Sequence, residues 1–271
     1  MPELPEVETT RSGIAPLITG CQVAELVLRA EKLRWPLDRQ LCCELPGQQV
    51  EAVERRAKYL LLRCSQGTLI LHLGMSGSLR VIDAGTTETK HDHVDLIFTN
   101  GSCLRFNDPR KFGALLWCAG DPAAHSLLAG LGPEPLAKEF DGDYLWQAAR
   151  KRKIAVKPFI MDQKLVVGVG NIYASEALFR AGIRPTLAAG KVSRARYHKL
   201  VAAIQEILAE AIQAGGTTIA DFQGADGKPG YFKQQLQVYG REGEPCQMCA
   251  RAISCVRLGQ RSTYFCSNCQ R

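Results

Sequence analysis

Two pairs of cysteines near the C-terminus constrain the fold of the last part of the chain. The first pair is Cys246 and Cys249, in a C-x2-C spacing. Cys266 and Cys269 repeat this spacing after an interval long enough for a hairpin. The pattern is typical of a tetrahedral site in which four thiolates bind one zinc ion. Four protein ligands leave no position for water, so we expect one structural zinc ion and look for catalytic chemistry elsewhere.

The composition is that of a folded chain without export or membrane signals. A chain of 271 residues can hold two domains or one large one, and a hydrophobic content of 46% is enough to build their cores. Its start lacks a basic region followed by an apolar stretch, and no apolar run approaches the roughly 18 residues of a membrane span. We therefore expect a cytoplasmic protein with no membrane partner. The odd count of eleven cysteines also argues against a disulfide framework.

The charge distribution leaves two interpretations open. The net charge is +7 at pH 7, which is compatible with a polyanionic partner but is also common on solvated surfaces. Basic side chains recur beside predicted turns, which favours contact with a nucleic acid. These side chains are Lys58, Arg110, Lys111, Arg150, Lys151, Arg152, Lys153, Lys157 and Arg261.

The first half of the chain has the pattern of an antiparallel β structure. After a helical stretch that Gly20 ends, short runs rich in Val, Leu and Ile alternate with period two. The sequence TNGS at residues 99–102 favours a tight hairpin, because Asn-Gly readily takes positive φ values. Residues 2–132 are therefore predicted to form a β-sandwich or barrel with one N-terminal helix.

The second half is predicted to be helical up to the cysteine pairs. Two prolines and a glycine in LGPEPLAKEF mark residues 133–149 as a linker. Residues such as Leu200 and Ile204 then recur at helical spacing, so residues 150–236 are expected to form a helical domain. Residues 237–271 would form the zinc finger. The fold class is thus α+β with three parts.

A glycine-rich turn in LVVGVGNIYASEALFRAG leads directly into a predicted helix capped by Asn171. Free N–H groups at such a helix start can bind a phosphate. The segment lacks the complete dinucleotide fingerprint and follows no βαβ unit. A DNA or RNA backbone is therefore a better candidate ligand than a nucleotide cofactor.

The opening sequence MPELPEVETT combines a helix start with two residues that need another explanation. Pro5 suits the first helical turn, and Glu6 and Glu8 oppose the positive end of the helix dipole. Pro2 and Glu3 lie before the predicted helix. Their role stays open at this point.

Lys58 also has two interpretations. It directly precedes YLLL, which has the composition of a buried strand. A lysine at the mouth of an apolar site can have a lowered pKa and transfer protons. Alternatively, Lys58 is a lysine at a strand end whose ammonium reaches solvent.

Motifs from every predicted domain stand in the order found in one enzyme family. They are PELPEVETTRSG, RRAKYLLL, HLGMSGSLR, KHDHVDL, DPRKFG, VVGVGNIYASEALF, DGKPGYF, QVYGREGEPC and the final four-cysteine hairpin. In these motifs the chain resembles bacterial formamidopyrimidine-DNA glycosylase, from residue 2 to residue 269. The resemblance implies a β-sandwich that carries the catalytic residues, a helix-two-turn-helix domain and a zinc-finger hairpin, with DNA between the domains.

The resemblance also implies the reaction and its catalytic residues. The family removes 8-oxoguanine and formamidopyrimidines from DNA and cleaves the strand at the abasic site. By similarity, Pro2 is the nucleophile and Glu3 its acid/base partner. Lys58 matches the proton donor in β-elimination, and Arg261 matches the donor in δ-elimination and a phosphate contact. Met1 must be removed first, because an internal proline nitrogen is an amide without a useful lone pair.

Further positions match residues through which the family binds DNA. Those that resemble DNA-contacting residues are His72, His91, Arg110, Arg152, Lys157, Asn171 and Tyr239. Met75, Arg110 and Phe112 resemble the triad that fills the gap left by the everted lesion. From residue type alone, Met75 and Phe112 would be assigned to a core. The expected partner is double-stranded DNA with oxidised purines or abasic sites, bound by a monomer.

Two departures and two alternatives remain. Lys111 stands where some relatives have a second arginine, which reduces a bidentate phosphate contact to a point charge. Ala220, in the loop 219–230 that is expected to cover the lesion, is lysine in some members.

The alternative functions are an endonuclease VIII-type glycosylase for oxidised pyrimidines and a zinc-ribbon DNA-binding protein without catalysis.

Overall fold

The computed structural model describes residues 2–216 and 235–271, which divide into two compact units. The first unit holds residues 2–129 and 214–216, and the second holds residues 130–213 and 235–271. Met1, Ala220 and the loop predicted at 219–230 lie outside the described residues. Within the described part, no helix has the length and apolar character needed to cross a membrane.

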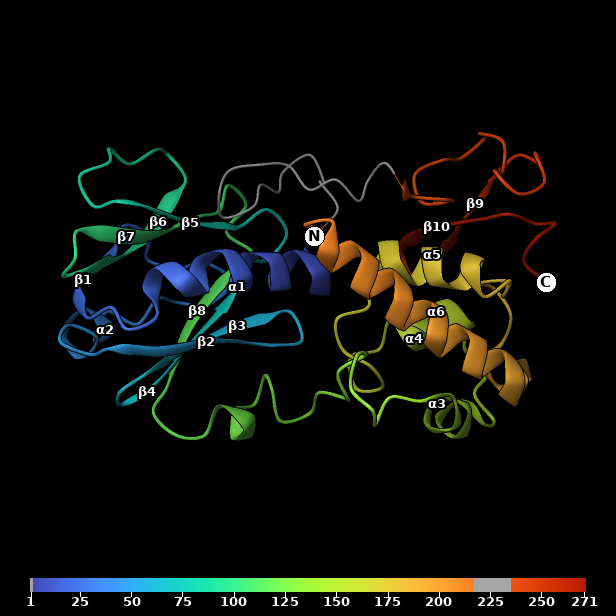
Figure 1. Cartoon of the computed structure of the whole chain (residues 1–271), viewed down its shortest axis with the longest axis horizontal. Helices are drawn as coiled ribbons and strands as arrows, with labels where there is room; N and C mark the ends of the chain where they lie inside the picture. Colours follow the sequence, from blue (N-terminus) through green and yellow to red (C-terminus); the bar gives the residue numbers. More distant parts are fainter. Residues whose placement is uncertain (1, 217–234) are drawn as a thin grey trace. The chain divides into compact units, whose positions relative to one another are not determined.

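The first unit is a β-sandwich with a helix at its start (Figure 1). Its strands form two four-stranded antiparallel sheets whose side chains meet in one hydrophobic core. One sheet has the order β1 (Val23–Leu28), β6 (Asp92–Phe98), β7 (Ser102–Asn107) and β5 (Ser78–Asp83). The other has the order β2 (Val50–Arg56), β3 (Tyr59–Cys64), β4 (Gly67–His72) and β8 (Ala114–Cys118). The predicted fold class is confirmed.

Helices of the first unit complete this core. Helix α1 (Leu4–Ile18) buries Ile14 and Ile18 fully against the sandwich, and α2 (Leu41–Glu44) contributes Leu41. A 3-10 turn, η1 (Pro122–Ala124), follows the last strand. The hairpin expected at TNGS joins β6 to β7, with Gly101 at φ +83°.

Strand β2 escaped the sequence pattern for a local reason. Its sequence is VEAVERR, in which Val50 and Val53 are buried three positions apart. The register against β3 shifts between Val50 and Ala52, as expected for a β-bulge. Because a bulge inserts one residue, the alternation of buried and exposed side chains with period two is lost. The charged sequence of the strand then has the pattern of a loop.

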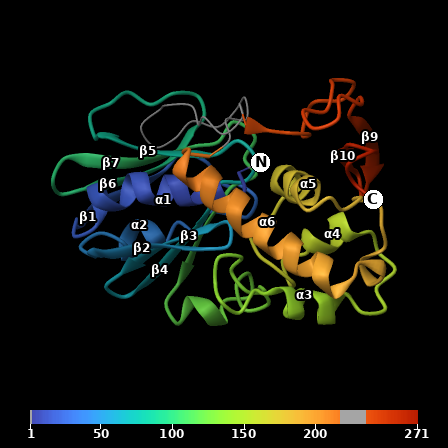
Figure 2. The ribbon, with the colours of Figure 1, turned by 45° about the vertical axis from the view of Figure 1, so that its right-hand side comes forward.

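The second unit contains helices and a β-hairpin. Its elements are α3 (Gly142–Ala149), α4 (Val156–Ile160), α5 (Asn171–Arg180), η2 (Ala189–Lys191), α6 (Arg194–Gln213), β9 (Ser254–Leu258) and β10 (Arg261–Phe265). Residues 133–149, expected as a linker, include α3, which packs against α6. Figure 2 shows the β9–β10 hairpin beside α5, which contacts β10. Leu200 and Ile204 are buried on α6 as the periodicity predicted.

The expected cap of α5 is wrong by one residue. The helix begins at Asn171, and its N-cap is Gly170. The side chain of Asn171 therefore does not cap the helix and takes part in other contacts, described below.

We predict that Leu96→Ala lowers the free energy of unfolding by roughly 2–5 kcal/mol, because a large side chain is lost from a packed core. Leu96 lies on β6, a strand with neighbours on both sides, and is 2% exposed. Urea unfolding followed by circular dichroism measures the change. The matched control is Leu17→Ala on α1, where the side chain is 53% exposed, and a similar loss in both variants would contradict the prediction.

Candidate active site and metal centre

The start of α1 is fixed by a capping box made of two buried carboxylates. Glu3 is the N-cap, and its backbone N–H donates to Oε2 of Glu6 at 2.8 Å. The Glu3 side chain in turn accepts from the backbone of Glu6. Glu3 is 2% exposed and Glu6 is fully buried. Glu3 thus has a structural role that the sequence pattern missed. Pro2, which directly precedes it, is buried.

Lys58 lies in a strained two-residue turn. Arg56 pairs with Tyr59 across the β2–β3 hairpin, so the turn consists of Ala57 and Lys58. Ala57 has φ +56°, a left-handed conformation that costs a residue with a Cβ about 1–2 kcal/mol. The Lys58 side chain is buried, at 3% exposure. Strain of this kind often marks a functional position.

Arg55 connects this turn to α1. Its Nε donates to Oε2 of Glu8 at 2.8 Å, and its Nη1 donates to the carbonyl oxygen of Ala57 at 2.9 Å. Burial raises the pKa of Glu8, but hydrogen bonds from Arg11 and Arg55 outweigh burial and lower it below its ordinary value. Glu8 is therefore ionised at neutral pH and supports the turn that carries Lys58.

His72 is a neutral histidine near Lys58. It ends β4 opposite Tyr59, and the two ring centroids are 4.9 Å apart. Burial, together with the positive charges of Lys58 and Arg34, lowers the pKa of His72 to about 4. Its Nδ1 accepts the backbone N–H of Gly74 at 2.9 Å, so in the neutral ring the proton is on Nε2. The ring can donate that proton in a hydrogen bond.

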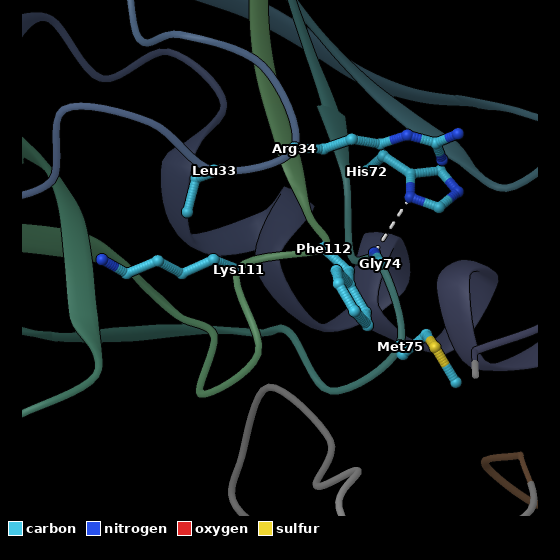
Figure 3. A pocket seen from close by; sticks show the side chains of 7 residues that line it. All are labelled: Leu33, Arg34, His72, Gly74, Met75, Lys111 and Phe112. Atoms are coloured by element: carbon cyan, nitrogen blue, oxygen red, sulfur yellow. Dashed lines mark hydrogen bonds between the residues drawn. The ribbon is translucent and has the colours of Figure 1, made fainter.

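His72 opens onto a pocket of about 500 Å³ that also presents Met75 and Phe112 (Figure 3). Phe112 is 48% exposed, so its assignment to a core by residue type is wrong. The guanidinium of Arg110 lies 5.5 Å from the centroid of the Phe112 ring. Lys111, between them, has φ +53°, and its side chain extends away from Phe112. The three residues expected to fill the gap in the DNA helix thus come from two adjoining loops.

His91, in contrast, is partly buried beside His93, with ring centroids 6.4 Å apart.

Lys157 is a buried residue that connects two elements of the second unit. It is 1% exposed, and its Nζ donates to Oδ1 of Asn171 at 2.7 Å. The same ammonium donates to the carbonyl oxygen of Ser262 at 3.1 Å and to Oγ1 of Thr263 at 2.9 Å. Lys157, predicted to contact DNA, therefore joins the start of α5 to β10.

Tyr239 is placed by a carboxylate that the sequence pattern did not single out. Glu176, on α5, is 3% exposed and accepts the backbone N–H groups of Gln237, Val238 and Tyr239 at 2.8–3.0 Å. Burial raises the pKa of Glu176, and the three donors act in the opposite direction. Nδ2 of Asn171 donates to the Tyr239 hydroxyl at 3.4 Å. The sequence signal that could have identified Glu176 is its position as a charged residue type inside the largely apolar run IYASEALF.

Arg152 and Arg261 are exposed. Arg152 follows α3 beyond its C-cap, Arg150. Arg261 pairs with Leu258, and the two-residue turn between them, Gly259–Gln260, has φ values of +52° and +62°. Arg261 thus sits at the tip of the hairpin, as predicted, directly before the residues that Lys157 contacts.

The four predicted metal ligands converge. The sulfur atoms of Cys246, Cys249, Cys266 and Cys269 all lie within 4.8 Å of one another. Sγ of Cys246 is 4.0 Å from that of Cys269, and Sγ of Cys249 is 3.5 Å from that of Cys266. A tetrahedron with metal–sulfur bonds of about 2.3 Å needs sulfur separations of about 3.8 Å, so the cluster fits a zinc ion.

We predict that His72 titrates near pH 4 in an NMR experiment, and that Lys58→Met raises this midpoint because one positive charge is removed. The folded pKa lies below the unfolded value of 6.5, so the unfolded chain binds more protons between these values. His72 therefore lowers stability as the pH falls from 6.5 to 4. A wild-type midpoint near 6.5 would contradict the environment described for this ring.

Three family models together match most of the chain. The formamidopyrimidine-DNA glycosylase N-terminal domain matches residues 1–115, and the H2TH domain of the same enzyme matches residues 131–223. The zinc finger found in FPG and IleRS matches residues 243–271. These matches cover the β-sandwich up to the start of β8, the helices of the second unit and the four-cysteine hairpin.

Individual relatives agree over the full length. The formamidopyrimidine-DNA glycosylase of Stutzerimonas stutzeri (strain A1501) is 60% identical over 271 residues, which is 100% of both chains. A crystal structure of Lactococcus lactis Fpg with FAPY-dG-containing DNA is 34% identical, with a TM-score of 0.91 over 99% of this chain and 100% of that one. The same protein with DNA containing an oxidised pyrimidine is 34% identical, with a TM-score of 0.92 over 100% of both chains. The chain belongs to the formamidopyrimidine-DNA glycosylase family.

Proposed function

We propose that this protein is a DNA glycosylase and abasic-site lyase that removes oxidised purines through an N-terminal proline amine. The observation that carries the proposal is the position of Pro2, buried directly before the Glu3–Glu6 capping box in a member of this family. Removal of Met1 would turn the Pro2 nitrogen into a secondary amine whose lone pair can attack carbon.

The proposed reaction proceeds by covalent catalysis. The Pro2 nitrogen bonds to C1′ of the damaged nucleotide, and the damaged base leaves with the electrons of the glycosidic bond. Proton transfer through Glu3 assists ring opening of the sugar and yields an iminium ion. This cation acidifies the hydrogen on C2′, so that the 3′-phosphate and then the 5′-phosphate leave by β- and δ-elimination. Water finally hydrolyses the iminium and restores the amine.

The charges around α1 act on the protonation of the Pro2 amine in opposite directions. The positive end of the helix dipole and the ammonium of Lys58 favour the neutral, nucleophilic amine. Ionised Glu3 or Glu6 would favour the protonated amine. The capping box engages both carboxylates with backbone N–H groups, which spreads their negative charge over the helix start.

Both units supply groups for binding duplex DNA. We assign Lys58 and Arg261 as proton donors in the two eliminations, and Arg261 also as a phosphate ligand. His72 can donate from Nε2, and His91 and Arg152 provide further contacts. Met75, Arg110 and Phe112 would replace the everted lesion in the base stack. Asn171 and Tyr239 would contact the DNA backbone while Lys157 holds Asn171 in place.

The metal that fits the cysteine cluster is zinc, in a structural role. Gln270 supports this part of the chain: its Oε1 accepts the N–H of Cys266 at 2.9 Å, and its Nε2 donates to the carbonyl oxygen of Ile183 at 2.8 Å. With zinc bound, the hairpin that carries Arg261 is fixed to the end of α5. Loss of the metal is then expected to remove DNA affinity and leave the β-sandwich folded.

We predict that Cys269→Ser lowers the zinc content below about one ion per chain and weakens DNA binding at least about tenfold. Elemental analysis and fluorescence anisotropy measure the two effects. Cys255→Ser is the matched control, because Cys255 lies on β9 outside the four-sulfur cluster. A variant that keeps both its zinc and its affinity would contradict the assignment.

The amine mechanism predicts that borohydride reduces the iminium ion and traps a covalent complex with lesion-containing DNA. Pro2→Gly should weaken trapping, and a preparation that retains Met1 should not trap at all. Pro5→Ala is the control, since it changes the helix start and leaves the N-terminal amine intact. Gel shift under denaturing conditions detects the complex. Its absence with an intact Pro2 terminus would favour a DNA-binding protein without catalysis.

A second substrate class is supported by a relative. Because Lactococcus lactis Fpg has been crystallised with DNA containing an oxidised pyrimidine, pyrimidine lesions are the rival substrates. We expect faster single-turnover excision of 8-oxoguanine opposite cytosine than of thymine glycol opposite adenine. The reverse order would favour the endonuclease VIII-type activity.

A further inference from the structure

The two loops that present Met75 and Phe112 share one buried carboxylate. Asp108 follows β7 and begins the loop 108–113 that carries Arg110 and Phe112. It is fully buried, at 0% exposure, although the residues it precedes are exposed. No step of the proposed reaction uses this side chain.

The Asp108 carboxylate binds donors from both loops. Oδ1 accepts from Oγ of Ser76 at 2.9 Å, in the loop 73–77 that carries Met75. Oδ2 accepts the backbone N–H of Gly113 at 2.7 Å, and Oδ1 also lies 3.3 Å from the N–H of Arg110. An ionised carboxylate supplies acceptors for all three donors, whereas an amide cannot.

The backbone of Asp108 extends this network. Its N–H donates to the carbonyl oxygen of His91 at 2.9 Å, and its own carbonyl oxygen lies 3.0 Å from Nε2 of the buried His93. The N–H of Lys111 also donates to this carbonyl at 3.2 Å and closes the turn. Asp108 is thus bonded on every polar atom to the segments that carry the proposed DNA-facing groups.

The two loops are also in direct contact. A Cβ added at Gly74 would lie 2.4 Å from the carbonyl carbon of Phe112 and 2.5 Å from the nitrogen of Gly113. One added at Gly113 would lie 2.5 Å from Cζ of Phe106. Only glycine allows this approach, so the relative position of Met75 and Phe112 depends on backbone packing and on the bonds of Asp108.

We propose that Asp108 is the positioning residue that makes Met75, Arg110 and Phe112 one preorganised wedge for entering duplex DNA. This proposal rests on the function proposed above, and it identifies Asp108 as the group that determines how the three wedge residues are placed. Asp108 is fully buried and is bonded to both loops, so it acts through these loops and not by direct contact with the substrate. Its role is therefore needed when a lesion must be everted from a stack, and not for the covalent chemistry at a sugar that is already accessible.

The test compares one enzyme on two substrates. Asp108→Asn keeps the side-chain size but places an N–H2 group against either Ser76 or Gly113. We expect single-turnover excision of 8-oxoguanine from duplex DNA to fall roughly ten- to hundredfold, the cost of a misplaced positioning group. Cleavage and borohydride trapping at an abasic site in single-stranded DNA should stay within about twofold, because no base has to be displaced from a stack.

Two further variants separate positioning from stability. Ser76→Ala removes one bond to Asp108 and should give a smaller loss with the same preference for the duplex substrate. Leu96→Ala destabilises the same sandwich at a strand position that pairs with Leu26 and Leu104, outside both loops, and should leave the ratio of the two rates unchanged. Equal losses on both substrates for Asp108→Asn and Ser76→Ala, or no loss on either, would overturn the proposal. Absence of trapping by the unaltered protein would instead contradict the proposed function.

Discussion

The reciprocal capping box at the start of α1 is the interaction on which the proposed chemistry depends. A chain terminus is ordinarily the least ordered part of a protein. Here Glu3 and Glu6 satisfy backbone N–H groups of the first turn, while the apolar face of α1 is buried in the sandwich core. The buried residue 2 thus directly precedes a helix start that is fixed by hydrogen bonds and by packing. An N-terminal amine can serve as a nucleophile only if it is placed as reliably as an internal side chain.

Buried ionisable side chains repeat this principle elsewhere in the chain. The Asp108 carboxylate accepts the Ser76 hydroxyl and two backbone N–H groups, and Glu176 accepts three backbone N–H groups. Lys157 donates to three oxygens. Such groups are costly to bury and are stable only when their hydrogen bonds are made. Each one holds segments that carry side chains of the proposed DNA-contact surface. The exposed groups belong to the proposed contact surface, and the buried ones determine where they point.

Sequence patterns predicted the elements that follow simple periodicity. The alternating strands and the Asn-Gly hairpin were found, and the cysteine spacing identified a cluster that does converge. Strand β2 was missed because its bulge destroys the period, and Asn171 was assigned as a cap although Gly170 occupies that position. The exposure of Phe112 could not be read from an apolar residue type.

The supporting residues of the site were harder to predict for a physical reason. Asp108 and Glu176 accept hydrogen bonds from backbone N–H groups. Every residue except proline has such a group, so the residue types in the sequence do not indicate which residues these carboxylates bind. Glu176 reaches Tyr239 from 63 positions away in the chain. Resemblance to a family supplied roles for Pro2 and the wedge, and these roles remain predictions.

The identity of the nucleophile is tested most directly by mass spectrometry of a borohydride-reduced complex digested with protease and nuclease. We predict that the sugar remnant is attached to the nitrogen of Pro2, in a peptide from which Met1 is missing. An adduct on Lys58, or on any other amine of the chain, would contradict it.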